Sequence, residues 1–476
     1  MEHFGDFIFF ILFSPTTMLG AVVLLLVLYL VSIIFISKEK RNEPPGPRPL
    51  PLLGNLLQLD LKRPHKTLFV VLAGYETVRE ALVNYAEEFG ERNISPILND
   101  VNQGHGILFA NGESWKELRY FALTTLKDFE FGKRLSHKIL AECSYLIQVI
   151  EEHKGMEIAC IRNTENTKCI RKTMHDDGAF VKMKALLESL LCYCLILQLY
   201  NMFPRLFRWI KNHQVVLKNV ETTIRDVTYL ITYLKETLDP DMCQGFVDCF
   251  LIWKQKEEEF GIDDSHYSEE NLIFTVIDLF VAGTDTTAAT LRWGLLLMAK
   301  YPHIQEQVHE ELRHVVGSRK VSVDDRKNLS YTDAVIHEIQ RLANILPVCL
   351  PHQTSRDVTF QGYFIKKGTI VFPLLTSVLY DESEWESPHT FNPSHFLDKE
   401  GKFVRRDAFM PFSAGRRMCL GEGLAKMELF LFFTSLVQRF CFTPPPGITE
   451  DELDLTLAVG FTTPPLSHML CAVSRQ

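Results

Sequence analysis

A long apolar stretch at residues 274–300 limits the folds open to this chain more than any other feature. The stretch lacks proline, and its apolar residues cover most faces of a helix. A helix that is apolar on most sides has to be surrounded by other elements. The sequence therefore predicts a buried central helix with a large body built around it.

Shorter patterns predict what surrounds this helix. Periodic apolar positions predict further helices at residues 303–316, 332–344 and 422–440. Short β-like runs separated by turn residues predict strands at residues 358–360, 363–365 and 369–372. We expect a mainly α (α+β) fold, in which one helix-rich domain carries minor β-sheets.

The net charge and the cysteines exclude several classes of protein. A net charge of −9 argues against a nucleic-acid-binding protein, which usually carries a basic excess. The eleven cysteines form no Cys-x-x-Cys pair, and only Cys192 and Cys194 lie close together. A zinc site or a disulfide framework needs better spacing than this. We expect most of the cysteines to be small buried hydrophobic residues in a reducing compartment.

A charge-free apolar run at residues 19–36 predicts an N-terminal transmembrane helix. Such a helix is about 27 Å long, close to the roughly 30 Å of the hydrocarbon core. A cleaved signal peptide is the alternative, but Glu2 and Asp6 stand where basic residues are expected, and no small-residue cleavage site follows. Basic residues after the run predict that this end faces the cytosol. The endoplasmic reticulum is then the expected membrane, with the rest of the chain cytosolic.

A stiff, proline-rich segment separates this anchor from the body. Residues 44–49 read PPGPRP, which favours an extended spacer over helix or sheet. We therefore expect a membrane anchor at residues 1–37, a basic and proline-rich hinge at residues 38–52, and a single domain at residues 53–476.

The strongest functional signal is the loop FSAGRRMCLG at residues 412–421. Cys419 stands directly before a predicted helix, where backbone N–H groups and the positive helix end favour a thiolate. Gly415 and Gly421 let the backbone approach a flat ligand, and Arg417 can pair with a carboxylate on it. The alternative is a buried structural cysteine. The combination favours a thiolate that holds a ligand.

This loop resembles the haem-binding signature of the cytochrome P450 superfamily at Phe412, Gly415, Arg417, Cys419 and Gly421. The chain is similar over most of its length to vertebrate microsomal members of family 2, and most of all to those of fish. The resemblance implies a P450-like helical haem domain with haem b (iron protoporphyrin IX) as cofactor. It also implies that Cys419 is the axial metal ligand, with Phe412, Arg417 and Gly421 contacting the cofactor.

The central helix contains a second motif, AGTDTT, at residues 282–287. Gly and Thr are poor residues for the middle of a helix, and a Thr hydroxyl can bond to the carbonyl one turn back, so a local kink is one interpretation. Asp285 argues for more, because a charge in an apolar helix needs a partner or a role. By resemblance this is the oxygen-binding groove, in which Thr286 would stabilise bound dioxygen and Asp285 would help to relay protons.

A third group of residues matches the family's contacts to the haem propionates. Trp115 and Arg119 are four residues apart and share a helix face, so both could donate to one propionate. Without the resemblance they would read as a half-buried Trp beside an exposed Arg. His352, Arg417 and Arg92 match other propionate donors of the family.

Glu338 and Arg341 form a fourth motif, with a structural role. Their spacing of three places them on one helix face, but exposed pairs of this kind contribute little. The resemblance implies a buried pair that supports the haem loop, completed by His395 in the segment at residues 391–396.

Two stretches depart from the family pattern. Between residues 67 and 70 the family has an additional segment with the end of a helix and two strands, so the N-terminal sheet should be truncated. Residues 154–197 do not resemble the expected helices, and residues 162–172 are polar and aperiodic. We hypothesise a mispredicted or splice-altered product with a poorly packed region there.

The predicted function is insertion of one atom of O2 into a lipophilic substrate, a fatty acid, steroid or xenobiotic, while the other atom goes to water. No nucleotide or flavin fingerprint is present, so NADPH-derived electrons should come from NADPH-cytochrome P450 reductase, with cytochrome b5 as a further candidate. Basic residues could dock such an acidic partner, among them Lys116, Lys133, Arg134, Arg416 and Lys426. No nucleic-acid partner is expected.

Two alternatives stay open at the level of sequence. The first is a haem-poor, catalytically dead variant, favoured by the anomalous middle segment. The second is a haem protein that rearranges hydroperoxides without a reductase, against which Asp285 and Thr286 argue. Substrate identity is not readable. The expected pocket walls are the loop after Arg92, the region around Phe203, residues 278–282 and the strand after Ile345.

Overall fold

The structure is a computed structural model. It describes residue 44 and residues 69–131, 133–152, 158–159, 200–201, 204, 211–239, 243, 245–261, 266–458, 460 and 462–475. The predicted anchor at residues 1–37 and Phe203 lie outside the described residues. So do the hinge at residues 38–52, apart from Pro44, and the anomalous segment at residues 154–197, apart from one short strand.

The chain divides into two compact units. One is formed by residues 1–70 and 354–370, and its described part is mainly the hairpin of β5 (Val358–Phe360) and β6 (Tyr363–Ile365). The other is formed by residues 71–353 and 371–476. This larger unit contains every residue of the predicted site.

Helices dominate the larger unit, as the sequence predicts. Its α-helices are α3 (Tyr75–Arg79), α4 (Pro96–Asn102), α5 (Gly112–Phe131), α6 (Lys133–Glu152), α11 (Lys211–Glu236), α12 (Phe246–Glu259), α13 (Glu269–Lys300), α14 (Pro302–Val315), α15 (Ser330–Ala343), α16 (Thr376–Leu379) and α17 (Glu422–Arg439). Short helical turns of other types are η1 (Glu80–Asn84), η2 (Val323–Asn328), η3 (Pro393–Phe396), η4 (Gly415–Arg417) and η5 (Glu450–Glu452).

The sheets are small. A four-stranded sheet has the order β1 (Phe69–Leu72), β7 (Ile370–Pro373), β4 (His352–Gln353) and β2 (Glu91–Arg92). A three-stranded sheet has the order β3 (Ile158–Ala159), β9 (Met469–Ser474) and β8 (Phe440–Thr443). In the first sheet β2 and β4 are antiparallel, with Arg92 opposite His352. This pairing brings two of the predicted cofactor residues side by side.

The predicted central helix is α13. It begins at Glu269, five residues before the predicted start, because Ser268 caps it: the Ser268 hydroxyl accepts the N–H of Asn271 at 3.1 Å. The predicted helices at residues 303–316, 332–344 and 422–440 are confirmed as α14, α15 and α17, and each boundary lies within two residues of its prediction. The three predicted strands are confirmed as β5, β6 and β7.

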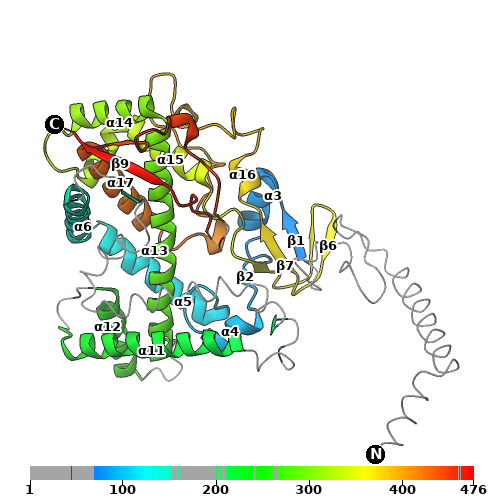
Figure 1. The fold of residues 1–476 in the computed structure, drawn as a ribbon. Coiled ribbons are helices and arrows are strands. Elements are labelled where there is room, and N and C mark those ends of the chain that lie inside the picture. Colours follow the sequence, from blue (N-terminus) through cyan, green and yellow to red (C-terminus); the bar gives the residue numbers. More distant parts are fainter. Residues whose placement is uncertain are drawn as a thin grey trace, which may run out of the picture. The chain divides into compact units, whose positions relative to one another are not determined.

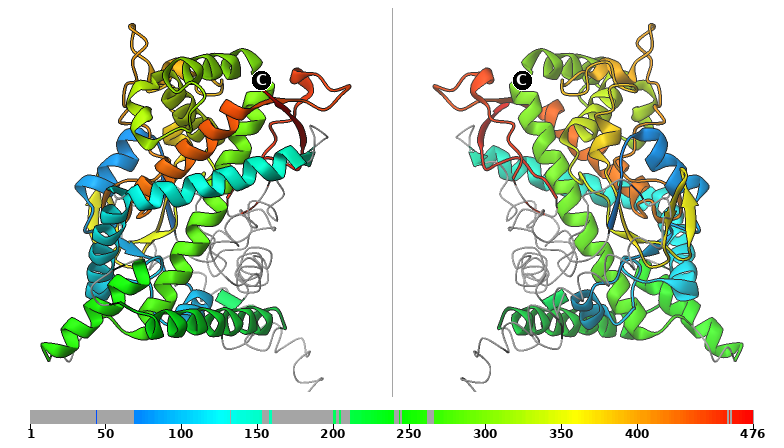
Figure 2. Two further views of the ribbon diagram at one scale, coloured as in Figure 1. Left: turned by 90° about the vertical axis from the view of Figure 1, so that its left-hand side faces the viewer. Right: turned by 90° about the vertical axis from the view of Figure 1, so that its right-hand side faces the viewer.

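Two apolar clusters pack against α13, one on each half of the helix, and Figures 1 and 2 show α13 running lengthwise among the other helices. The C-terminal half, including Leu296 and Leu297 at 0% exposure, packs against α6, α14, α15 and α17. The N-terminal half packs with residues of α5, α11 and α12 around Phe250. Burial of each such side chain stabilises the fold by roughly 1.5–3 kcal/mol. The middle of α13 belongs to neither cluster, which leaves one stretch of this core helix available to a site.

Among the described residues, α13 is the helix long and apolar enough to cross a membrane by length and composition. Its packing identifies it as a core helix, because Leu291 and residues 293–299 are buried by neighbouring helices. The indole N–H of Trp293 also donates to the Thr463 carbonyl at 2.9 Å.

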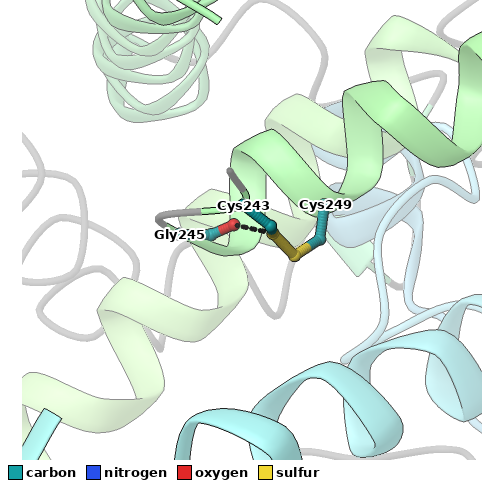
Figure 3. The surroundings of a disulfide bond; sticks show 3 residues. All are labelled: Cys243, Gly245 and Cys249. Carbon is teal, nitrogen blue, oxygen red and sulfur yellow. Dashed lines mark hydrogen bonds between the residues drawn. A yellow bond between two sulfur atoms is a disulfide. The ribbon is translucent and has the colours of Figure 1, made fainter. Parts of the chain in front are cut away.

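The cysteines only partly follow the expectation. Cys143, Cys349 and Cys471 are buried and unbridged, as small hydrophobic residues should be. Cys243 and Cys249, however, form a disulfide at the start of α12, with their Cα atoms 5.6 Å apart (Figure 3). The spacing of six residues gave no signal for this pair, because the turn before α12 brings the two cysteines together. The disulfide closes a short local loop.

Candidate functional site

The loop at residues 412–421 is fastened to the body at Gly415. Gly415 has a φ of +71°, and a Cβ at this position would lie 1.8 Å from the carbonyl oxygen of Leu82 in η1. This corrects the expectation that Gly415 leaves room for a ligand, since its missing side chain admits another backbone segment. Gly421 fits the expectation better, because a Cβ there would meet no atom within 4 Å.

Cys419 lies near the end of this loop, three residues before α17 begins at Glu422. Its backbone N–H donates to the Phe412 carbonyl at 2.9 Å, and its sulfur accepts the N–H of Gly421. The side chain is exposed by surface area, yet protein atoms surround it closely enough that burial raises the pKa of the thiol. The Gly421 N–H lowers that pKa but does not outweigh burial. The loop therefore favours a thiolate only when a cation faces the sulfur.

Arg417 is the best-anchored cation of the site. Its Nε donates to the Gly90 carbonyl at 2.8 Å, and its Nη2 donates to the Ala110 carbonyl at 2.9 Å and to Asn111 Oδ1 at 2.7 Å. The guanidinium carbon lies 3.4 Å from the centre of the Trp115 ring. Burial and the neighbouring arginines lower the pKa of Arg417 to about 8. The guanidinium of Arg417 is therefore buried close to several other positive charges.

Two further arginines lie beside Arg417. Arg92 donates through Nη1 to the Leu350 carbonyl at 3.0 Å, and its backbone is clamped by the side-chain amide of Asn111. Arg119 donates through Nη2 to the Met418 carbonyl at 2.7 Å. Within the described residues neither Arg92, Arg119 nor Arg417 forms an ion pair with a carboxylate, whereas the adjacent Arg416 pairs with Glu87. Such a cluster is suited to binding an anion.

Three buried donor atoms in this cluster have no hydrogen-bond partner among the residues that the structure describes. They are Arg92 Nε, Trp115 Nε1 and Arg417 Nη1, on side chains that are 4–6% exposed. A buried donor left unsatisfied costs about 1–3 kcal/mol, and native proteins rarely accept this at three neighbouring atoms. A bound anion with several oxygen atoms would satisfy all three. Trp115 and Arg119 thus lie on one face of α5, as their spacing predicts, next to Arg417.

His352 is held in one tautomer. Its Nδ1 lies 2.7 Å from the Phe89 carbonyl, which can only accept, so Nδ1 carries the proton. Burial, together with Arg92 and Arg417, lowers the pKa of His352 to about 3. In this neutral form Nε2 is an acceptor and cannot donate to a carboxylate. The predicted donor role of His352 therefore requires a bound anion that offsets the two arginines.

The middle of α13 presents an open face to the site. Ala282 and Gly283 are exposed although the helix is buried on both sides of them, and a Cβ at Gly283 would meet no atom within 4 Å. The hydroxyl of Thr286 donates to the Ala282 carbonyl at 2.7 Å, as expected for Thr inside a helix. Asp285 accepts a hydrogen bond from the Thr462 hydroxyl, so this partly buried carboxylate has a partner.

The segment at residues 105–108, which precedes α5, is held against the N-terminal half of α13 by hydrogen bonds. Asp278 Oδ2 accepts the N–H groups of Ile107 at 2.8 Å and Leu108 at 2.9 Å, and Asn271 Oδ1 accepts the N–H of Gly106 at 3.2 Å. Burial raises the pKa of Asp278 to about 6, although the two N–H groups oppose this shift. The sequence predicts Asp278 only as part of an expected pocket wall, and not as the acceptor for these two N–H groups.

Glu338, Arg341 and His395 form one buried network. Arg341 donates to both carboxylate oxygens of Glu338 at 2.7 and 2.8 Å, and His395 Nδ1 lies 3.2 Å from the same carboxylate. Glu338 and Arg341 are 0% exposed. Arg341 also donates to the carbonyls of Leu379 and Pro388. The network ties α15 to the segment that precedes the loop at residues 412–421.

Comparisons with known proteins identify the family. Residues 44–472 match the sequence profile of the family described as cytochrome P450. Cytochrome P450 2K1 of Oncorhynchus mykiss is 59% identical, with 97% of this chain and 98% of the relative covered. Cytochrome P450 2K6 of Danio rerio is 51% identical at the same coverage, and cytochrome P450 2C4 of Oryctolagus cuniculus is 40% identical over 94% and 98%.

The chain belongs to the cytochrome P450 family. These identities place it in family 2 of the P450s and make it a monooxygenase of the P450 kind. The helix-rich P450 fold with small sheets is thereby confirmed.

The residues of this P450 fit the haem that the family carries. Haem has a Lewis-acidic iron for a thiolate and two carboxylates for cationic donors. Cys419 offers an accessible sulfur, and Arg92, Trp115 and Arg417 offer the three unpartnered donors. Gly283 and Gly421, which have open space where a side chain would stand, suit a flat ligand between α13 and the start of α17. The donor set therefore matches the cofactor in charge and in chemistry.

Several residues of the P450 site were not found from the sequence. Asn111 links Arg92 to Arg417, and Cys349 lies 3.8 Å from His352 Nε2 and 3.4 Å from Ser413 Oγ. Both act through contacts between distant segments, which no local pattern announces.

Proposed function

We propose that this P450 inserts one oxygen atom of O2 into a lipophilic substrate, a fatty acid, steroid or xenobiotic, at the endoplasmic reticulum membrane. The observation that carries the proposal is the cluster of three unpartnered buried donors, Arg92, Trp115 and Arg417, beside the accessible thiol of Cys419. This arrangement suits a cofactor that offers a metal to the thiol and carboxylates to the donors, as haem does. The haem, when bound, supplies the site at which dioxygen is activated.

The chain's own residues would divide the work of holding the cofactor. Cys419 would hold the iron through its thiolate, with the Gly421 N–H stabilising the charge on the sulfur and the Phe412 carbonyl fixing the backbone of Cys419. Arg92, Trp115, Arg119 and Arg417 would bind the propionates. His352 would join them in its charged form.

The open face of α13 would handle oxygen and protons. Thr286 projects from this face one turn after Ala282, and releasing its bond to the Ala282 carbonyl would free the hydroxyl to donate to dioxygen. Asp285, held by Thr462, would exchange protons with water nearby. The apolar substrate would lie against the wall formed by α13 and the latched segment at residues 105–108.

The family and the sequence support the proposed partners and location. Electrons would come from NADPH through NADPH-cytochrome P450 reductase, with cytochrome b5 as a further donor. Residues 1–37 would anchor the protein, residues 38–52 would act as a hinge, and residues 53–476 would form the catalytic domain on the cytosolic side. Lys116 and Arg416 are among the basic residues that could receive an acidic partner.

The test is the spectrum of the reduced protein under carbon monoxide. Wild-type protein should give the strongly red-shifted band that only an intact thiolate–haem shows. Cys419→Ser should lose this band and all NADPH-dependent turnover, because a serine hydroxyl does not supply the anionic sulfur. Cys441→Ser, at another incompletely buried cysteine, is the matched control and should keep both.

Three outcomes would redirect the proposal. A Cys419→Ser variant with the wild-type spectrum would overturn it, and wild-type protein without haem would favour the catalytically dead variant. Conversion of hydroperoxides without NADPH would favour the rearranging enzyme. Labelled palmitic acid, progesterone and 7-ethoxycoumarin, each incubated with reductase and NADPH, represent the three substrate classes.

A further inference from the structure

Ser413, the second residue of the loop at residues 412–421, has a backbone conformation that serine rarely adopts. Its φ is +63°, in the left-handed region where the Cβ of any residue other than glycine is crowded. The Ser413 N–H donates to the Met410 carbonyl at 3.1 Å. The N–H of Cys419 donates at 2.9 Å to the carbonyl of Phe412, the residue directly before Ser413. A strained residue of this kind persists only where its surroundings hold it.

The hydroxyl of Ser413 is in contact with a buried thiol. Cys349 Sγ lies 3.4 Å from Ser413 Oγ, and within the described residues Cys349 is the hydrogen-bond partner of this hydroxyl. Cys349 is 4% exposed, and its backbone N–H donates at 2.9 Å to the carbonyl of Pro373, the last residue of β7. The two side chains come from segments 64 residues apart. The contact therefore attaches the loop to the sheet that contains β7.

His352 holds the thiol from its other side. Its Nε2 lies 3.8 Å from Cys349 Sγ, within hydrogen-bond reach of the large sulfur atom. Because Nδ1 donates to the Phe89 carbonyl at 2.7 Å, Nε2 of the neutral ring can accept the thiol hydrogen, and the sulfur can then accept the hydroxyl hydrogen of Ser413. When His352 is charged, the sulfur accepts from Nε2–H and the thiol hydrogen turns to Ser413 Oγ. In both forms Cys349 connects His352 to Ser413.

The loop is thereby fastened at two neighbouring points. Gly415 provides one, since its missing side chain admits the carbonyl of Leu82. The contact between Cys349 and Ser413 provides the other, two residues earlier. Cys419 follows in the same loop, and its N–H is bonded to the residue that precedes Ser413. A change in the backbone of Ser413 would therefore move the sulfur of Cys419.

We propose that Cys349 is a positioning residue for the haem site, which holds Ser413 in its left-handed conformation and so keeps Cys419 in place to bind the iron. Cys349 acts through Ser413. The inference rests on the proposed function, because it names a support for the same thiolate. The alternative is that Cys349 only fills space in the core, as a buried cysteine commonly does. The two roles differ in one respect, since only the proposed role depends on the backbone of Ser413.

The test combines changes at Cys349 and Ser413. Cys349→Ala removes the sulfur, whereas Cys349→Ser keeps a group that can both donate and accept. Ser413→Gly is the decisive change, because glycine adopts the left-handed conformation without a crowded Cβ and needs no contact to hold it. The double variant, Cys349→Ala with Ser413→Gly, then shows whether the defect of Cys349→Ala lies in the backbone of Ser413. Cys143→Ala is the matched control, because it removes a buried sulfur from α6.

The rate at which ferric holoprotein gives up haem to excess apomyoglobin measures how firmly the loop holds the cofactor. We expect Cys349→Ala to lose haem roughly threefold to tenfold faster than wild-type protein, the range for one buried hydrogen bond, and Cys349→Ser to stay within about twofold of wild type. The double variant should return to within about twofold of Ser413→Gly alone. In the Cys143→Ala background, Ser413→Gly should change the rate only by the factor that it has in wild-type protein.

A second readout tests the contact itself without using the haem. The S–H stretching band of Cys349 is obtained by infrared difference between each protein and its counterpart that also carries Cys349→Ala. Hydrogen bonding changes the frequency of this band, so Ser413→Ala should shift it from its wild-type position. Cys441→Ser, at another thiol outside this site, should leave the band where it is. A band that Ser413→Ala does not move would contradict the contact.

The outcomes separate this inference from the proposed function. Wild-type protein without the thiolate–haem band would defeat the proposed function, while the S–H band would still test the contact of Cys349 with Ser413. Haem loss from Cys349→Ala at the wild-type rate would overturn the inference. Faster loss that Ser413→Gly does not correct would show that Cys349 only fills space, which also overturns it. Should Cys349→Ala fail to fold, Ser413→Ala and Ser413→Gly decide: the alanine variant keeps the crowded Cβ and should lose haem faster, and equal rates would reject the role.

Discussion

Arg417 does two jobs with one guanidinium. Three of its hydrogen bonds hold Gly90, Ala110 and Asn111 together, while Nη1 remains for a ligand. The planar group also stacks on Trp115, which keeps both donors at fixed positions. The contacts among Gly90, Ala110 and Asn111 and the position of the unpartnered Nη1 thus depend on the geometry of a single side chain.

Replacing Arg417 with lysine should therefore lower the haem content sharply. An ammonium group is a point charge that cannot span three acceptors and a stacking surface, and each buried group left unpaired costs about 1–3 kcal/mol. The measurement is haem per polypeptide in purified protein, with helix content by circular dichroism alongside. Arg416→Lys is the control, because Arg416 is more exposed and pairs with Glu87 at the surface. Equal haem content in both variants would show that haem binding does not require the guanidinium group of Arg417.

At this scale the sequence predicted the clustered donor residues better than the groups that hold them in place. Arg417, Trp115 and Arg119 lie together because a local motif or helical spacing fixes each one. Asn111 and the tautomer of His352 depend on carbonyls and amides of distant segments. Such partners are set only when the chain has folded, so no spacing within the sequence reveals them.

Among the elements, α13 provides the face against which the segment at residues 105–108 packs. Asn271 and Asp278 are seven residues apart, two turns of helix, and therefore share the face that receives the segment at residues 105–108. Gly106 adopts a φ of +87°, and a Cβ there would lie 2.5 Å from Asp278 Oδ2. The backbone of this segment packs against and donates to side chains of α13, and these contacts fix the position of the segment.

Asp278 should make stability depend on pH in a defined sense. Its folded pKa of about 6 lies above its ordinary value of 3.8, so folding favours the protonated form. The cost of ionisation is absent below pH 3.8, grows as pH rises and is complete above about pH 6. Asp278→Asn mimics the protonated acid and should stabilise the protein above pH 6 by up to about 3 kcal/mol. That gain should vanish near pH 4.

Urea unfolding at pH 7.5, 6.0 and 4.5 measures this dependence. Asp278→Ala is the matched comparison, because it removes the acceptor of both N–H groups and should destabilise the protein at every pH. A gain for Asp278→Asn that stays constant across the three pH values would contradict the assignment. The helix boundaries themselves were predictable from caps and periodicity, whereas this latch was not, because it needs the backbone direction of a distant segment.

The larger unit is held together as much by buried polar groups as by its apolar clusters. Glu338 accepts from Arg341, from His395 and from the backbone of Asn392, and Arg341 continues to the carbonyl of Thr390. These contacts join α15 to η3 across more than fifty residues of sequence. The sequence predicted the Glu338–Arg341 pair but not its contacts with residues 390–395. Helical spacing shows which residues of one helix are neighbours, but it does not show which distant segment packs against them.

Removing Glu338 should therefore damage the whole unit and not only one helix. Glu338→Ala leaves the fully buried charge of Arg341 without its carboxylate, a change that costs roughly 3–5 kcal/mol in buried pairs. We expect low yield of soluble holoprotein and a large drop in the midpoint of thermal unfolding. Glu113→Ala removes one partner of the exposed pair with Lys116 and should leave stability almost unchanged. Because the network makes no direct contact with Cys419 among the described residues, any Glu338→Ala protein that does fold should keep the thiolate–haem band. A folded variant with normal thermal stability would show that the apolar clusters alone hold the unit together.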